Sequence, residues 1–229
     1  MKMNDLTLII PAKLEAESLP KVLDEIKDLE CKKKVILESS DKETIEAIQK
    51  FDCEIVYQKN KGYGDALISG INSVETNYLC IFNADGSFDP KYLRSMLLKC
   101  ENFEFVFASR YLREGGSEDD TFLTKFGNFF FSFLGNLLFS LSLSDILYTF
   151  IIGKTKSFKS LNLKSRDFCL CVEIPINAKK QKKIYCDVPS QERKRIAGFK
   201  KVKEFRDGFK ILFYLLKRFI GLNKLIINV

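Results

Sequence analysis

Short apolar segments of strand-forming residues alternate with helix-forming segments over the first half of this chain. The strand-like segments are residues 6–10, 34–37, 53–57, 78–82 and 105–108. The helical patterns cover a segment from Ser18, residues 42–50, a segment ending at Val74, and residues 90–99. This alternation favours an open, mostly parallel α/β sheet with helices on both faces. A chain of 229 residues is long enough for one such domain and an appendage.

The segment after the fourth predicted strand carries the strongest signal for a binding site. Residues 78–82 are apolar, and Asn83, Asp85 and Asp89 follow them directly. In an open α/β sheet, the carboxyl ends of the strands border the crevice in which ligands bind. A carboxylate there needs a partner, and a common one is a divalent metal that holds a phosphate-bearing ligand. The alternative is a simple turn, because turns also favour Asp.

The charges are divided unevenly along the chain. Residues 1–150 carry 17 Lys and Arg and 24 Asp and Glu, a net charge of −7, whereas residues 151–229 carry 20 and 6, a net charge of +14. This asymmetry predicts an anionic partner for the C-terminal third. We expect no nucleic acid as that partner, because the basic residues form no recognisable nucleic-acid-binding module and are interleaved with an apolar face.

Seven Cys and the lack of His limit the chemistry that the chain can perform. The Cys residues form no Cys-x-x-Cys pair, and no signal-peptide pattern is present, which favours reduced thiols in a cytoplasmic protein. His is the commonest general base and the commonest transition-metal ligand. Any proton transfer must therefore use Asp, Glu, Lys or the substrate itself.

Two apolar helices are predicted in the second half. Residues 126–144 carry no charge, and a polar stripe recurs at Asn128, Ser132, Asn136, Ser140 and Ser144. We expect this helix to pack on the domain or to lie at a membrane surface rather than to span a bilayer. Residues 204–229 form a basic amphipathic helix, which would dock on the domain or on anionic lipid. Ten Lys and Arg in residues 179–203 favour the membrane.

Five short motifs occur in one order between residues 5 and 210. They are Pro11 with Glu15, residues 60–67 (Asn-Lys-Gly-Tyr-Gly-Asp-Ala-Leu), Asn83-Ala-Asp85 with Asp89-Pro90, residues 108–111 (Ala-Ser-Arg-Tyr) with Gly115-Gly116, and residues 192–198 (Glu-Arg-Lys-Arg-Ile-Ala-Gly). Together they resemble family 2 glycosyltransferases of the GT-A fold, particularly the polyprenyl- or dolichol-phosphate sugar synthase branch. The resemblance implies a GT-A domain over residues 1–203, a nucleotide-sugar donor, Mg²⁺ or Mn²⁺, and inversion at the anomeric carbon.

The resemblance also implies roles for individual residues. The nucleoside and its base would be bordered by Pro11, Glu15 and Glu38. The turn along which the donor lies would be formed by Lys61, Gly62 and Gly64, where glycine lets the backbone approach a ligand and the following helix start favours negative charge.

The metal and the phosphates would be bound by a second group of residues. Asp85 would ligate the metal beside Asn83, and Arg110 would contact a phosphate or the acceptor. Arg193 and Arg195 would contact the diphosphate or an anionic acceptor, because guanidinium groups suit phosphate oxygens.

Asn83 departs from the family pattern, which has Asp at this position. Metal affinity should be weaker with one carboxylate, although one carboxylate and substrate phosphates can still hold Mg²⁺. A lipid-phosphate acceptor is already anionic and needs no general base. A sugar hydroxyl would need one, and Asp145 and Glu173 are the candidates.

The resulting hypothesis is a cytoplasmic enzyme, peripheral on the inner face of the cell membrane. It would transfer a sugar from a nucleoside diphosphate to a polyprenyl phosphate or to a cell-surface polysaccharide or glycolipid, and it could form a homo-oligomer. One alternative is a catalytically degenerate scaffold that binds a nucleotide sugar or lipid. A sugar-phosphate nucleotidyltransferase is disfavoured, because no Gly-rich basic loop follows the first strand.

Overall fold

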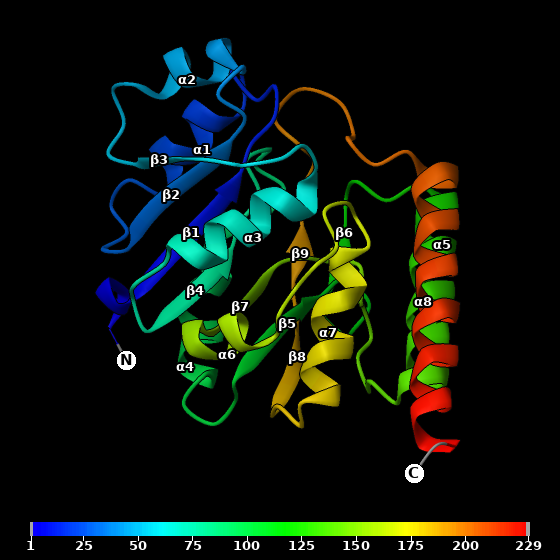
Figure 1. Cartoon of the computed structure of the whole chain (residues 1–229). Coiled ribbons are helices and arrows are strands. Elements are labelled where there is room, and N and C mark those ends of the chain that lie inside the picture. The colour runs from blue at the N-terminus through cyan, green and yellow to red at the C-terminus, as the bar shows by residue number, and fades with distance from the viewer. Residues whose placement is uncertain (1, 228–229) are drawn as a thin grey trace.

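A seven-stranded sheet forms the centre of the computed structural model, which describes residues 2–227 (Figure 1). Its order is β3-β2-β1-β4-β7-β5-β8, with bounds β1 Leu6–Pro11, β2 Lys32–Leu37, β3 Glu54–Tyr57, β4 Tyr78–Ile81, β5 Phe105–Ser109, β7 Ile151–Lys154 and β8 Tyr185–Pro189. A small separate sheet pairs β6 (Gly116–Ser117) with β9 (Gln191–Glu192). The helices are α1 Leu19–Glu25, α2 Lys42–Ile48, α3 Tyr63–Ser73, α4 Leu93–Lys99, α5 Phe122–Phe139, α6 Thr155–Ser160, α7 Leu170–Lys180 and α8 Glu204–Ile227, with 3₁₀ turns at Met3–Asp5 and Pro90–Tyr92.

The sheet is mostly parallel, as the sequence predicts. β1 pairs in parallel with β2 and β4, and β5 pairs in parallel with β8. The exception is β7, which lies antiparallel between β4 and β5. The sequence pattern predicted the first five strands, and it missed β7 and β8. Because β1, β4 and β5 point the same way, Pro11, Asn83 and Arg110 come together at one edge of the sheet.

Alternate residues of the central strands enter opposite layers of the core. Leu8 and Ile10 face the layer that contains α1, α2 and α4, while Ile9 faces the layer that contains α3, α6 and α7. Both layers are rich in fully buried Leu, Ile and Phe side chains. Helices therefore cover both faces of the sheet, which is the expected arrangement for buried parallel strands.

Helix α5 differs from its predicted bounds of 126–144. It begins after Thr121, whose hydroxyl accepts a hydrogen bond from the Thr124 amide, and it ends at Ser140, which has a left-handed conformation (φ 53°). Residues 141–144 leave the helix so that Leu141 and Leu143 enter the core. The non-helical Ser140 and Ser144 therefore do not continue the predicted polar stripe.

The polar side of α5 faces the domain, and its aromatic side faces outward. Asn128 donates a hydrogen bond to the Tyr111 hydroxyl (2.8 Å), and the Ser132 hydroxyl accepts one from the Ile146 amide (3.2 Å). The Asn136 side chain donates to the Leu143 carbonyl (2.8 Å) and accepts from the Leu143 amide (3.1 Å). The helix is thus fixed to the domain by these hydrogen bonds and by Phe131, Leu134 and Leu138, which pack against the core. Many of its other Phe residues stay exposed.

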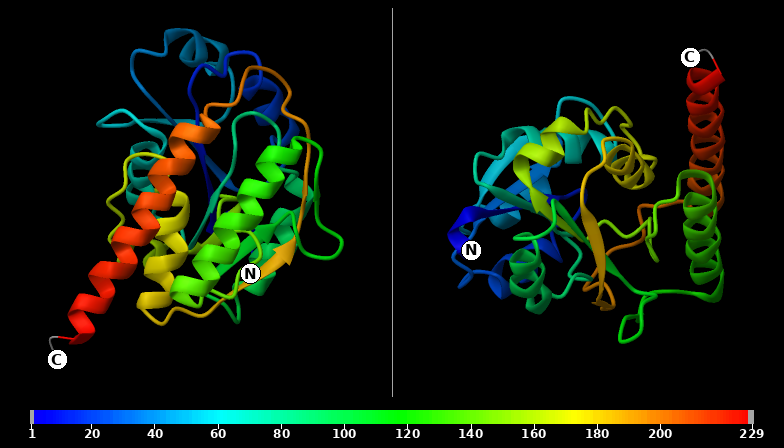
Figure 2. Two further views of the ribbon diagram at one scale, coloured as in Figure 1. Left: turned by 90° about the vertical axis from the view of Figure 1, so that its right-hand side faces the viewer. Right: turned by 90° about the horizontal axis from the view of Figure 1, so that it is seen from below.

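Helix α8 lies beside α5 on one side of the molecule (Figure 2). The Phe131 ring lies next to Gly208, and the rings of Phe139 and Phe219 meet edge to face with centroids 6.2 Å apart. Ile211 and Leu215, on the side of α8 that faces the domain, are buried. The sequence predicts a helix over 204–229, and α8 covers Glu204–Ile227; residues 228–229 lie outside the described part of the chain.

Replacing Asn136 by Ala should destabilise the fold by about 1–3 kcal/mol, because the amide and carbonyl of Leu143 would lose their partners. The matched control is Leu137→Ala, one position along, where the side chain is 65% exposed. We expect the control to change the free energy of unfolding by less than about 0.5 kcal/mol. Urea unfolding followed by circular dichroism measures both, and equal effects would contradict the arrangement of α5 described above.

Candidate active site

A cavity of about 740 Å³ opens at the carboxyl ends of β1, β4 and β5. It is closed from the other side by residues 199–211 and by the first half of α5. Among the predicted site residues, the cavity is lined by Pro11, Glu15, Glu38, Gly62, Asn83, Asp85, Arg110 and Arg195. The predicted residues that do not line it are Lys61, Gly64, Asp145, Glu173 and Arg193.

Asp85 is held in a fixed orientation directly after β4. Its Oδ1 accepts hydrogen bonds from the amide (3.0 Å) and the hydroxyl (2.7 Å) of Ser87. Asn83 donates from Nδ2 to the same hydroxyl at 3.4 Å. The turn requires Gly86, which has φ +81° and lies against the Ile196 side chain. The predicted carboxylate is therefore presented to the cavity by a tight turn, with Oδ2 directed toward Arg195 at 3.7 Å from Nη1.

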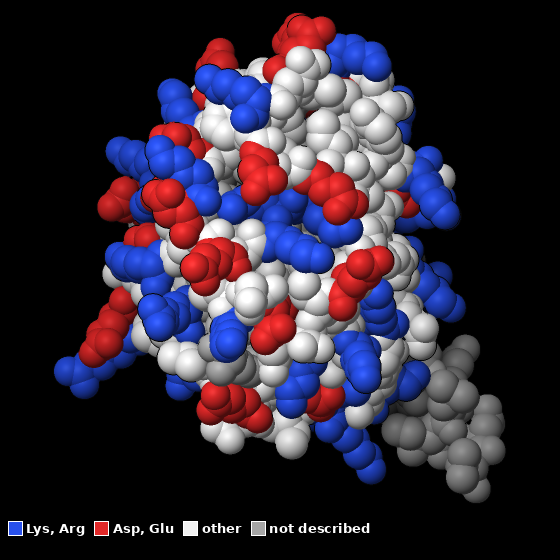
Figure 3. Space-filling view, turned by 90° about the vertical axis from the view of Figure 1, so that its left-hand side faces the viewer, with Lys and Arg blue, Asp and Glu red and all other residues white. Residues whose placement is uncertain are grey.

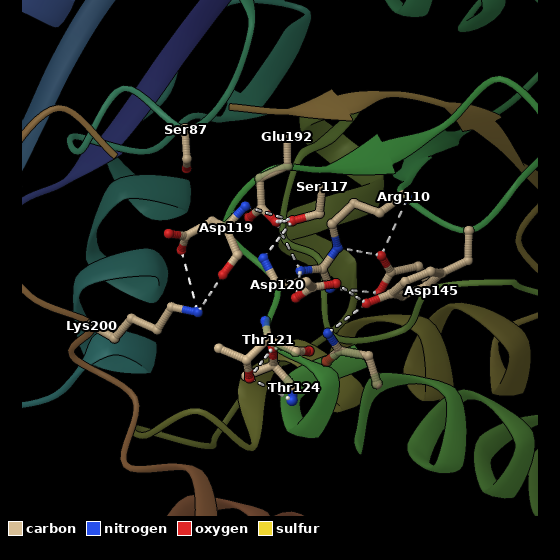
Figure 4. A network of polar contacts seen from close by, with 12 residues as sticks. Ser87, Arg110, Ser117, Asp119, Asp120, Thr121, Thr124, Asp145, Glu192 and Lys200 are labelled. Carbon is tan, nitrogen blue, oxygen red and sulfur yellow. Dashed lines mark hydrogen bonds and ion pairs between the residues drawn. The ribbon is translucent and has the colours of Figure 1, made fainter. Parts of the chain in front are cut away.

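Residues 193–203, which we name the basic loop, cover the acidic part of the cavity. Arg195 lies between Asp85 and Asp119, with Nη2 3.1 Å from Asp119 Oδ2. Lys200 donates to the Asp119 carbonyl at 2.7 Å (Figure 4), and Lys201 lies 3.3 Å from Glu15 Oε1. Cationic side chains of the loop thus neutralise the acids of the cleft. An anionic ligand would compete for the same cations.

Asp119 is a site residue that the sequence reasoning missed. It follows Gly116 by three positions, in the acidic run Glu118-Asp119-Asp120. This acidic run is the sequence signal that could have identified Asp119. It follows Arg110 by only a few residues, so it should lie near the same edge of the sheet. Asp119 and Asp120 both line the cavity.

Arg193 contacts other parts of the protein rather than the cavity. Its guanidinium forms two hydrogen bonds with the Glu25 carboxylate, at 2.7 and 2.9 Å. It also donates to the carbonyls of Gly86 (3.1 Å) and Phe88 (2.8 Å). Arg193 therefore fixes the start of the basic loop to α1 and to the turn after Asp85, whereas Arg195 faces the ligand space.

Arg110 is the centre of a buried ionic network (Figure 4). Its Nε and Nη2 donate to the two oxygens of Asp145, at 2.7 and 3.1 Å, and Nη1 donates to Glu192 at 3.2 Å. Asp120 Oδ1 lies 3.6 Å from the same Nη1, and the Tyr148 ring covers the guanidinium. Although Arg110 lines the cavity, its hydrogen-bonding groups are directed at these carboxylates, so its predicted contact with a phosphate would require breaking buried pairs.

The acids of this network outnumber its cation. Burial raises the pKa of Glu192 above its ordinary value, although Arg110 opposes that shift. The Asp145 side chain has no exposed surface, and both of its oxygens accept from Arg110. A general base must reach the proton that it removes. Asp145 cannot do so in this arrangement, and it serves instead to position Arg110.

Glu173 is also enclosed. It is 2% exposed, and its carboxylate accepts hydrogen bonds from the amides of Lys164 and Ser165. These bonds fix the loop of residues 161–167 to α7, and the backbone of that loop packs against the start of α3. Glu173 therefore supports a loop beside the cavity but does not line the cavity itself.

Gly62 and Gly64 are required by a protein contact. A Cβ atom on Gly62 would lie 2.2 Å from the Arg166 carbonyl oxygen, and one on Gly64 would lie 2.2 Å from that of Ser165. Gly62 also has φ +120°, a conformation that favours glycine. The sequence analysis expected the donor to approach these glycines closely, but the backbone of residues 165–167 occupies that space. Gly62 nevertheless lines the cavity.

Asp145→Asn should lower the free energy of unfolding by about 3 kcal/mol, because it breaks a buried paired charge. Glu118→Gln, an exposed acid of the neighbouring loop, is the control and should change stability by less than about 0.5 kcal/mol. Chemical denaturation measures both. A variant at Asp145 that kept full stability but lost activity would show instead that this carboxylate acts on the substrate.

Comparison with known proteins places this site in a family. The fold is similar to that of glucosyl-3-phosphoglycerate synthase from Mycobacterium tuberculosis in complex with uridine diphosphate, with a TM-score of 0.72 and 15% identity over 93% of this chain and 79% of that one. The same synthase in complex with Mn²⁺, uridine diphosphate and glucosyl-3-phosphoglycerate gives a TM-score of 0.74 and 14% identity over 94% and 80%. A sequence model of glycosyl transferase family 2 matches residues 7–161, which is more than half of the chain. The chain therefore belongs to glycosyl transferase family 2.

Proposed function

We propose that this chain transfers a sugar from a nucleoside diphosphate to a polyprenyl-phosphate-like lipid acceptor, with inversion at the anomeric carbon, at the cytoplasmic face of the cell membrane. One observation carries the proposal. A single cavity joins the acidic sheet edge around Asp85 and the cations of the basic loop to an apolar wall from α5 and α8. Such a cavity suits a charged donor at one end and an amphipathic acceptor at the other.

The donor end of the cavity has the chemistry that a nucleoside diphosphate needs. Glu38 forms an ion pair with Lys13 at 3.1 Å. This end therefore offers a hydrogen-bond acceptor (the Glu38 carboxylate) and a hydrogen-bond donor (the Lys13 ammonium) for the edge of a nucleobase. Arg195 and Lys200 lie where the diphosphate would meet Asp85. When the phosphates bind, these cations can exchange carboxylate oxygens for phosphate oxygens.

The residues around Asp85 fit a divalent ion that arrives with a diphosphate. Among the described residues, no group of three His, Cys, Asp or Glu side chains is placed to hold a metal by itself. Asp85 and the Asn83 amide oxygen would supply protein ligands, and phosphate oxygens would supply others. When bound, the ion would neutralise charge on the departing nucleoside diphosphate.

The acceptor end favours an acceptor that is already an anion. Asp145 and Glu173, the candidates for a general base, are buried and hydrogen bonded within the protein. The wall of the cavity also carries the cations Lys203, Arg206 and Lys210 next to apolar side chains of α5. A phosphate on an apolar carrier matches both features and needs no general base.

Asp85→Asn should abolish the metal-dependent part of nucleotide binding and lower the transfer rate by about a hundredfold or more, because it removes the carboxylate that we propose as the metal ligand. Asp89→Asn is the control from the same loop, since Asp89 caps a 3₁₀ turn instead of lining the cavity. Calorimetry with UDP and GDP, with and without Mn²⁺, measures binding, and transfer to polyprenyl phosphate measures the rate. Failure of the unmodified protein to bind any nucleotide would refute the proposed donor site.

Asn83→Asp should strengthen Mn²⁺ binding and raise activity at limiting metal, because it adds a second carboxylate beside Asp85. A titration of transfer rate against Mn²⁺ concentration measures the change. Asn102→Asp, on an exposed turn after α4, adds the same charge far from the cavity and should leave the titration unchanged. A catalytically degenerate scaffold would stay inactive in both variants.

A further inference from the structure

An unusually large aromatic surface is exposed on α5 and α8. The exposed residues of α5 are Phe122, Leu123, Phe126, Phe129, Phe130, Phe133 and Leu137, and those of α8 are Phe205, Phe209, Phe213, Leu216 and Ile220. They recur at every third or fourth position and so form one stripe along each helix. Phe129 and Phe213, in the middle of the two stripes, are 67% and 70% exposed. A soluble monomer rarely exposes apolar side chains that are contiguous over such a length.

The two stripes form a single surface, which we name the aromatic platform. The contacts of Phe131 with Gly208 and of Phe139 with Phe219 hold the helices side by side. Both helices lie in front of the domain when that side is viewed directly (Figure 2, left). By contrast, the opposite side of the molecule carries Lys, Arg, Asp and Glu across it (Figure 3).

We propose that the aromatic platform docks in the plane of an anionic lipid bilayer. Basic residues occupy its borders: Arg206, Lys210 and Lys217 follow one edge of the α8 stripe, and Lys125 lies beside the α5 stripe. Aromatic and aliphatic side chains bordered by Lys and Arg are the composition of helices that lie in the headgroup region. A second copy of the chain is a poorer partner, because a symmetric contact would bring identical basic borders into the same interface.

The platform lies on the membrane rather than across it. Within the described residues, α5 is long and apolar enough to span a bilayer by length and composition. However, Asn128, Ser132 and Asn136 tie its polar side to the domain along most of its length. Spanning would break these bonds and place the freed polar groups in lipid. Docking in the plane keeps every bond and buries the exposed face.

The platform also borders the opening of the cavity. Leu123, Phe199 and Phe205 line the cavity and are at the same time 46%, 65% and 71% exposed. An acceptor carried in the bilayer could therefore reach the cavity along these side chains without entering water. This link rests on the proposed function, whereas the docking itself depends only on the platform.

The chain contains no Trp, so single Trp substitutions give a direct measure of insertion depth. Phe126→Trp and Leu137→Trp report on the two ends of α5, and Phe213→Trp reports on α8. With vesicles of phosphatidylcholine and phosphatidylglycerol, we expect a blue shift and equal, shallow quenching by brominated lipids at all three positions. Tyr57→Trp, on the edge strand β3 far from the platform, should show neither.

Two outcomes of the depth measurement would overturn the proposal. No change in fluorescence at any platform position would exclude docking. Quenching that deepens steadily from Phe126→Trp to Leu137→Trp would show that α5 crosses the bilayer.

Substitutions on the platform separate lipid binding from self-association. Phe209→Glu with Phe213→Glu should weaken vesicle binding at least about tenfold, and Lys217→Gln should weaken binding about fivefold to anionic vesicles only. Nucleotide binding measured by calorimetry should not change, since none of these residues lines the cavity. Light scattering without lipid is the test against a second copy: a dimer that the Phe variant dissociates, together with no vesicle binding, would overturn the proposal and leave the donor site unaffected.

Discussion

The bidentate pair between Arg110 and Asp145 joins the segments from which the cavity is built. Arg110 directly follows β5, Asp145 lies between α5 and β7, and Glu192 in β9 contacts the same guanidinium. A buried guanidinium must have its partners, because an unpaired charge in the interior costs several kcal/mol. When these three segments meet, the chain that follows β9 passes over Asp85 as the basic loop. Residues 143–146, before β7, are then placed so that their amides bind Ser132 and Asn136 of α5. The cleft and the platform thus depend on one ionic centre.

The cations of the basic loop balance the charge of the acids in the cleft. Arg195, Lys200 and Lys201 meet Asp85, Asp119 and Glu15. The side chains of these ion pairs are only 9–33% exposed. A phosphate that takes the place of a carboxylate would therefore have to replace its charge-assisted contacts. The same loop is fixed at one end by Arg193 on Glu25 and continues at the other into α8. Movement of the loop on donor binding would therefore be confined to its middle, next to Asp85.

Hydrophobic period and turn chemistry sufficed to predict the first five strands, helices on both faces of the sheet and the position of Asp85, since these depend on local patterns. The parallel strand β8 was missed. β7 was missed because its four residues follow an irregular segment and pair antiparallel with strands distant in sequence. The partners of Arg110 and Glu173 were missed for the same reason: long-range pairing decides whether a charged residue faces a ligand or the protein. Gly62 and Gly64 show the limit most clearly, because a glycine that admits a ligand and one that admits a neighbouring loop are identical in sequence.

The sequence predicted the polar stripe of α5, but it did not predict whether that stripe faces the domain or the outside. An apolar helix face normally turns inward, because burial of apolar surface is the main favourable term in folding. Here Asn128, Ser132 and Asn136 turn inward, and Phe129 and Phe133 turn outward. The inward hydrogen bonds contribute about 1 kcal/mol each, and Phe131, Leu134 and Leu138 of the same helix pack against the core. These contacts still leave a whole aromatic face exposed to water. The orientation becomes favourable when something apolar covers that face, and the basic borders of α8 are the reason for which we propose an anionic bilayer as the cover.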